Sequence, residues 1–204
     1  MAFSSLAAPA FSQPHETDKE KNLLKQGYEE ICAESYPPAI ETLTRAVKLN
    51  KDDDAARRYL VYAELQVGQV TDAFENLKIL AASKNPQAMD HYLEGEAHLL
   101  IGWIDSAESD FNTALSLQPD MKAATVGLIK VRVCNSDFDD AVKLCSECMT
   151  ETKALKPPNK KLSEYFDRLY GAVKMVESGS QSNGLPGMDG ETALPPPEHV
   201  QLGT

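Results

Sequence analysis

The sequence predicts an all-α solenoid, in which antiparallel helix pairs stack one after another, and three observations support this fold class. Similar residues recur every 34 positions over four units. Within each unit, apolar residues are separated by three, four and seven positions, which is the spacing of one helix face. The 204 residues are 42% apolar, enough to bury a core, and contain no apolar run long enough to span a membrane.

The second helix of each unit is marked by an alanine that recurs every 34 positions: Ala39, Ala73, Ala107 and Ala141. A bulky apolar residue precedes each alanine by three positions. Further apolar residues or cysteines follow it by four and seven positions. A turn is expected five residues before each alanine, at Glu34, Gly68, Gly102 and Ser136. Each unit therefore ends in one amphipathic helix that begins after a turn.

The first half of each unit is also helical by its apolar spacing. Gly27 and Gly95 are small at positions where two antiparallel helices approach closely. Acidic residues 52–54 suit the start of the first helix of the second unit, since carboxylates stabilise a helix N-terminus. Pro119 follows the second helix of the third unit, where that helix is expected to end.

This pattern resembles the tetratricopeptide repeat family, whose 34-residue unit is a pair of antiparallel helices. The third unit matches best, through Gly95, Gly102, Ala107, Phe111, Ala114 and Pro119. The resemblance covers residues 20–155, as units 20–53, 54–87, 88–121 and 122–155, and implies a right-handed superhelical solenoid. Two usually apolar positions of the first helices hold polar residues, among them Glu64 and His98. Either these helices are rotated by about one residue, or their exposed side is unusually apolar.

The two ends of the chain differ from the repeats. Residues 160–177 are predicted to form one further amphipathic helix, within a capping segment 156–177 that covers the exposed end of the stack. Residues 178–204 are rich in Gly, Pro and Ser and are predicted to be disordered. Residues 1–19 are either a disordered start or contain, in residues 1–12, the end of a signal peptide. The protein is expected to be exported in the second case and cytoplasmic in the first.

The resemblance implies that a protein or peptide binds in a concave groove formed by the first helices. On the register of the family, the expected groove residues are Leu24, Tyr28, Tyr62, Met89 and Tyr92. These side chains predict an apolar or amphipathic peptide. The alternatives are that they form the core between helices, or that a terminal segment of the chain itself fills the groove. No register supplies the paired cations that the chaperone-tail clamp of this family needs.

Charge is concentrated in the third unit. The chain carries a formal charge of −11, and residues 88–121 contain seven acidic residues and no Lys or Arg. The candidate acidic patch consists of Asp90, Glu94, Glu96, Asp105, Glu108 and Asp110. It predicts a basic partner, with an ordinary solvated helix face as the alternative. Trp103 lies in the adjacent turn, either packed or as an exposed anchor. The negative charge disfavours nucleic acid as a partner.

Two residue groups have side chains of the types that carry chemistry. His91, Glu94 and His98 lie on one side of a helix, but about 10 Å separates the two His along its axis, which is awkward for one metal ion. Cys145 and Cys148 have the spacing of a redox pair but occupy apolar repeat positions. We therefore expect no cofactor, no metal and no enzymatic activity. A self-associating structural module (a homo-oligomer) and, less favoured, a metal- or thiol-dependent enzyme remain as alternatives.

Overall fold

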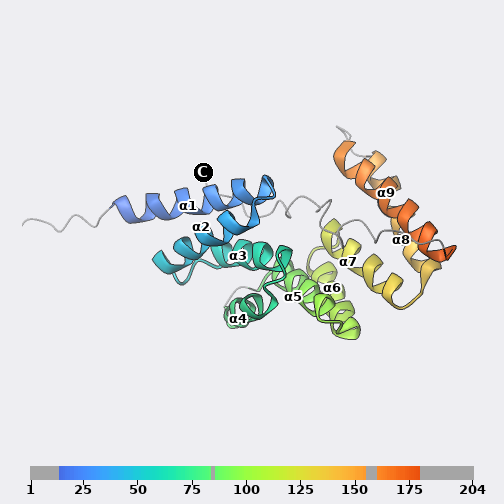
Figure 1. Ribbon diagram of the computed structural model, residues 1–204, viewed down its shortest axis with the longest axis horizontal. Helices are drawn as coiled ribbons and strands as arrows, with labels where there is room; N and C mark the ends of the chain where they lie inside the picture. Colours follow the sequence, from blue (N-terminus) through green and yellow to red (C-terminus); the bar gives the residue numbers. More distant parts are fainter. Residues whose placement is uncertain (1–13, 84–85, 155–159, 180–204) are drawn as a thin grey trace, which may run out of the picture.

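The computed structural model describes residues 14–83, 86–154 and 160–179, and these residues form nine α-helices and no strands (Figure 1). The helices are α1 (Pro14–Cys32), α2 (Tyr36–Leu49), α3 (Asp54–Gln66), α4 (Val70–Ala81), α5 (Ala88–Leu100), α6 (Ile104–Leu117), α7 (Lys122–Cys134), α8 (Phe138–Ala154) and α9 (Lys160–Glu177). The signal peptide predicted in residues 1–12 and nearly all of the tail predicted in residues 178–204 lie outside the described residues.

The helices stack as four pairs followed by α9, so the predicted helical solenoid with a C-terminal capping helix is confirmed. Each of α2, α4, α6 and α8 packs on the helix before it and the helix after it. The first helices α1, α3, α5 and α7 also contact one another in a row, whereas the second helices lack comparable contacts with one another. A stack that is closer along its first helices curves toward them, so we call this side of the described residues the inner face.

Four residues with positive φ set the turn inside each pair. Glu34, Gly68, Gly102 and Ser136 have φ values of 56°, 75°, 78° and 62°. The next residue in each turn donates its N–H to a carbonyl five residues back, as from Gln69 to Glu64 at 2.9 Å. This is the hydrogen bond that closes a helix through a left-handed residue. The 34-residue period predicted all four turns.

Close helix packing depends on glycine at three positions of the first helices. A Cβ atom on Gly27 would lie 2.5 Å from the Leu43 side chain, and one on Gly95 would lie 2.6 Å from the Phe111 ring. Gly127 of α7 approaches the other side of that ring, where an added Cβ would also lie at 2.5 Å. Phe111 is fully buried between these two glycines. The predicted close approach at Gly27 and Gly95 is therefore confirmed, and Gly127 adds a contact between units.

The first helix begins earlier than the predicted first unit. The repeat pattern in the sequence begins at residue 20, whereas α1 begins at Pro14. Proline is well suited to the first helical position, because it lacks an N–H that would have no partner there. At the other end, α9 occupies the predicted residues, 160–177, and buries Tyr165, Phe166, Leu169 and Val173. No helix in the described part of the chain is long and apolar enough to cross a membrane.

Candidate functional site

The inner face carries a row of equivalent residues, one from each first helix. Tyr28, Tyr62, Glu96 and Lys130 follow one another at the 34-residue period, and we call them the inner-face row. Lys130 Nζ lies 3.1 Å from Glu96 Oε2, so an ion pair links the third and fourth units. The Lys130 and Glu96 side chains are only 10% and 14% exposed. The row therefore combines two phenols with a largely buried ion pair.

The phenol groups of several tyrosines lie close to Glu96. Burial raises the pKa of Tyr62, Tyr92 and Tyr165, and in each case the nearby Glu96 carboxylate raises the pKa further. Tyr165 belongs to α9, so the capping helix contributes to the same cluster. With pKa values well above neutrality, these hydroxyls keep their protons and remain hydrogen-bond donors.

The predicted groove anchors are more deeply buried than expected. Leu24, Tyr62 and Tyr92 are 9%, 3% and 6% exposed and belong to the main hydrophobic core, which agrees with the alternative that these residues form the core between helices. The reason is close packing of the first helices on one another, which encloses the rings. Tyr28 and Met89 are partly exposed. The Tyr28 ring contacts Tyr59, with ring centroids 5.2 Å apart. The structure thus brings Tyr62 and Tyr92 together but leaves Tyr28 beside a different tyrosine.

The predicted acidic patch is also not a single exposed surface. Neighbouring units supply cations to three of its carboxylates: Arg58 to Asp90, Lys130 to Glu96 and Arg132 to Glu108. The Arg58–Asp90 pair is bidentate, with N···O distances of 2.5 and 3.0 Å, and both side chains are at most 5% exposed. The sequence hid this pairing, because it counts charge along the chain, whereas the partners lie 24 to 34 residues away.

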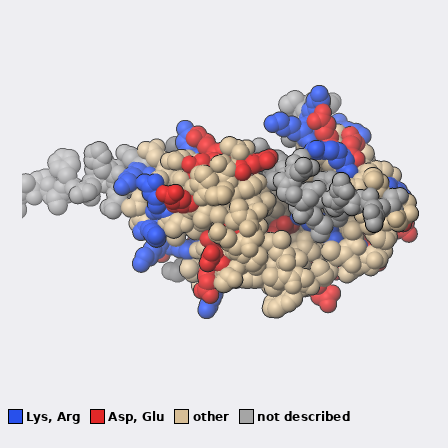
Figure 2. Space-filling model, in the orientation of Figure 1, with Lys and Arg blue, Asp and Glu red and all other residues tan. Residues whose placement is uncertain are grey.

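Histidines of the third unit accompany two further carboxylates of the predicted patch. His91 Nδ1 lies 3.2 Å from Glu94 Oε2, and His98 Nδ1 lies 2.6 Å from Asp110 Oδ2. Asp105 remains exposed on α6. Figure 2 shows acidic and basic residues interspersed on the visible side, with Lys and Arg concentrated near the α1–α2 end and over α9. The acidic residues of this unit therefore act mainly as contacts between and within units.

The two histidines of the candidate metal group have different neighbours. The His98 ring contacts both Phe74 and Trp103, with centroid distances of 5.5 Å to each. Trp103 stacks on this ring but is 59% exposed, so it is not enclosed by a neighbouring turn. Among the described residues, no three His, Cys, Asp or Glu side chains form a group that could hold a metal ion.

The four cysteines are free thiols. Burial raises the pKa of Cys145 to about 12 and that of Cys148 to about 11. A thiol with such a pKa is almost entirely protonated near neutral pH and is a poor nucleophile. Cys32 and Cys134 are exposed, and they occupy equivalent positions at the ends of α1 and α7.

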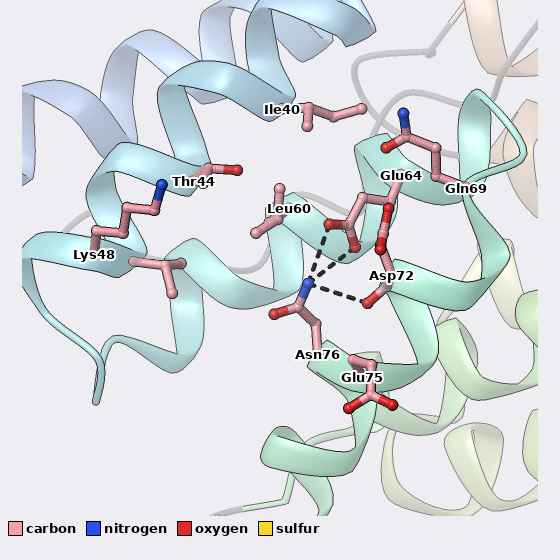
Figure 3. A pocket seen from close by; sticks show the side chains of 10 residues that line it. Ile40, Thr44, Lys48, Leu60, Glu64, Gln69, Asp72, Glu75 and Asn76 are labelled. Carbon is pink, nitrogen blue, oxygen red and sulfur yellow. Dashed lines mark hydrogen bonds between the residues drawn. The ribbon is translucent and has the colours of Figure 1, made fainter.

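A pocket between α3 and its paired helices contains the buried carboxyl group of Glu64, one of the polar residues at a usually apolar position of the family. The pocket measures about 380 Å³ and lies between α2, α3 and α4. Asn76 Nδ2 donates to both carboxylate oxygens of Glu64 at 3.1 Å and to the carbonyl of Asp72 at 3.2 Å (Figure 3). Burial raises the pKa of Glu64 to about 7, although the Asn76 hydrogen bonds and the nearby Arg57 lower it.

The polar residues at the unusual family positions thus have a structural explanation. Glu64 in the second unit bonds a residue twelve positions later on α4, and His98 in the third unit contacts the equivalent residue of α6. For Glu64 and His98, neither a rotated helix nor an apolar outer side is needed, because each of these two side chains has a polar partner on its paired helix. A 34-residue alignment of Glu64 with His98 and of Asn76 with Asp110 would have indicated this.

The helix pairing, the 34-residue period and the four equivalent left-handed turns give the chain a tetratricopeptide-like architecture, as the sequence predicted. No family model matches the chain. Over 113 residues it is 34% identical to the heat shock protein STI1 of Saccharomyces cerevisiae, an alignment that covers 52% of this chain and 18% of that protein. The chain therefore spans less than a fifth of that relative.

A solved structure of a thermophilic TPR protein from Thermus thermophilus is 20% identical. The superposition covers 72% of this chain and 97% of that one, with a TM-score of 0.47.

Proposed function

We propose that this protein is an interaction module that binds an extended peptide segment of another protein along its inner face. The observation that carries the proposal is the row of first helices, which contact one another along one side of all four units and leave Tyr28 partly exposed there. Curved helical repeats use such extended surfaces for binding. Tyrosine is favoured at binding sites because it offers a large contact area at low entropic cost.

A binding role without catalysis is supported by the chemistry of the candidate groups. The buried thiols of Cys145 and Cys148 have raised pKa values, and His91 and His98 are each engaged with a carboxylate on the third unit. The third unit has its charges paired with neighbouring units, so we place binding on the inner face and not on an acidic patch.

The proposal is tested by selecting peptides from a displayed library of random sequences on the immobilised protein. Binding of the selected peptides is then measured by fluorescence anisotropy with wild type, Tyr28→Ala and the control Tyr170→Ala. Both tyrosines are partly exposed, and Tyr170 lies on α9 beside a separate core cluster. We expect Tyr28→Ala to weaken binding at least five-fold, about 1 kcal/mol, as for an interface anchor.

Tyr170→Ala should leave the affinity within two-fold of wild type. Equal affinities for the two variants would refute binding at the inner face, and so would a selection that yields no peptide above background. Thermal unfolding of both variants, followed by circular dichroism, checks that each remains folded under the conditions of the binding assay.

A further inference from the structure

The first helix of the second unit, α3, is enclosed more completely than its neighbour α5. Residues 56–65 of α3 are all buried. Each of the two helices contacts two first helices and two second helices. Even so, five side chains of α5 are partly exposed although each aligns with a buried position of α3, 34 residues earlier. These are His91, Glu94, Glu96, His98 and Leu99. Of these positions, Glu96 corresponds to Tyr62 of the inner-face row. Helix α3 therefore excludes water more completely than α5 does.

We propose that the inner face is the docking site of the chain's own proline-rich C-terminal segment, residues 180–204, which a partner peptide must displace. This inference rests on the proposed function. The C-terminal segment, which lies outside the described residues, competes with a partner peptide for the inner face.

The sequence of this segment suits a tyrosine-lined surface. It contains Pro186 and the run Pro195, Pro196 and Pro197, several apolar side chains, and no Lys or Arg. Consecutive prolines favour the polyproline II conformation, whose carbonyl groups have no internal hydrogen bonds. Aromatic grooves bind such segments, since the rings pack on the proline faces and hydroxyl or indole groups donate to the carbonyls. Tyr28, which is partly exposed on the inner face, offers such a ring.

The connection to α9 permits this contact. Helix α9 ends at Glu177, and Gly179 has a φ of 70°, the left-handed conformation that turns a chain away from its helix axis. The 25 residues from 180 to 204 reach about 78 Å at the polyproline II rise of roughly 3.1 Å per residue. Four helix-to-helix steps of about 10 Å separate α9 from α1 along the inner face, or about 40 Å. The segment is therefore long enough to extend along the whole row.

Attachment to α9 also favours the segment over a free peptide. A tethered ligand acts at an effective concentration in the millimolar range, so it competes even when its intrinsic affinity is weak. Replacing the three consecutive prolines with serine should release the segment without touching the repeats.

The test uses Cys32, an exposed thiol at the end of α1 that lies close enough to Tyr59 and Tyr62 to raise their pKa. The full chain carrying Cys134→Ser is labelled at Cys32 with a benzophenone maleimide, irradiated and digested with trypsin. Because Lys174 is the last Lys or Arg, the entire C-terminal segment is released as one peptide, residues 175–204. The control carries the same label on Ile79→Cys of α4, an exposed position, in a chain with Cys32→Ser and Cys134→Ser.

We expect the label at Cys32 to cross-link to peptide 175–204 within one chain, as read from a mixture of ¹⁴N and ¹⁵N protein. The yield should fall at least five-fold when Pro195, Pro196 and Pro197 are replaced with serine, and the Ile79→Cys control should give little product. Equal yields from the two labels, no cross-link from Cys32, or cross-links mainly between chains would overturn the inference.

The display-selected peptides separate this inference from the proposed function. They should bind at least five-fold more tightly to the triple serine variant than to wild type. If they bind both proteins equally and still depend on Tyr28, the inner face binds peptides and the C-terminal inference is wrong. If they bind neither and the Cys32 cross-link is absent, both proposals fail.

Discussion

Replacing the buried Glu64 with glutamine should stabilise the protein above neutral pH. Glu64 is 4% exposed, and burial raises its pKa from the model-compound value of 4.5 to about 7. The substitution Glu64→Gln keeps the size of the side chain and an oxygen that accepts from Asn76, but removes the charge that burial disfavours.

The size of the effect follows from the pKa difference between the unfolded and folded states. A shift from 4.5 to about 7 corresponds to roughly 3 kcal/mol of preference for the protonated carboxyl in the folded state. The protonated Glu64 carboxyl contributes its full stabilisation to the wild-type protein below the unfolded pKa. This contribution is lost as the pH rises through the folded pKa. Water in the open pocket screens the charge, so we expect about 1 to 3 kcal/mol.

The assay is urea unfolding of wild type and Glu64→Gln at pH 5 and pH 8, followed by circular dichroism. The variant should gain about 1 to 3 kcal/mol relative to wild type between these two pH values. Glu75→Gln, which alters an exposed carboxylate of the same pocket, controls for the general change in net charge and should show a much smaller difference. The electrostatic reasoning would be refuted if the free energy of unfolding of Glu64→Gln, relative to wild type, stayed constant or fell between pH 5 and pH 8.

Three further substitutions test the packing and the turns, each by urea or thermal unfolding. Glu34→Gly should raise the free energy of unfolding by about 1 kcal/mol, because Glu34 holds a left-handed φ of 56° that glycine adopts without strain; an unchanged stability would contradict this. Asp90→Asn should lower it by about 2 to 4 kcal/mol, since it removes the buried carboxylate that accepts from Arg58, and a loss under about 1 kcal/mol would show that the pair is not needed. Gly127→Ala should lower the free energy of unfolding by about 1 to 3 kcal/mol, because the added Cβ clashes with the buried Phe111 ring. Gly171→Ala on α9 is the control, since its Cβ meets open space, and it should be neutral or slightly stabilising. Similar effects of the two substitutions would count against close packing at Gly127.

Most of the fold could be predicted because its signals are periodic along the chain. The alanines of the second helices, the glycines at close contacts and the four turn positions all follow the 34-residue period, and each has a local physical reason. The start of α1 at Pro14 was missed, since the polar residues there lack the apolar spacing that marked the other helices.

The candidate site was harder to predict because its chemistry depends on contacts between units. The acidity of the third unit is real, but Arg58 and Lys130 come from the units before and after it. Likewise, Tyr62 and Tyr92 were correctly placed on the first helices, yet their exposure depends on how closely those helices pack. Composition by segment cannot show either effect.

The ion pairs of the third unit have a consequence for how repeats can be shuffled in evolution or design. A negative unit held between cations of its two neighbours can occupy only one place in the array, because two copies of it side by side would bring buried carboxylates together without their cations. Duplication, deletion or exchange of this unit should therefore be costly, even though every unit shares the same backbone plan. Charge determines the order of the units, whereas the 34-residue period specifies only their shape.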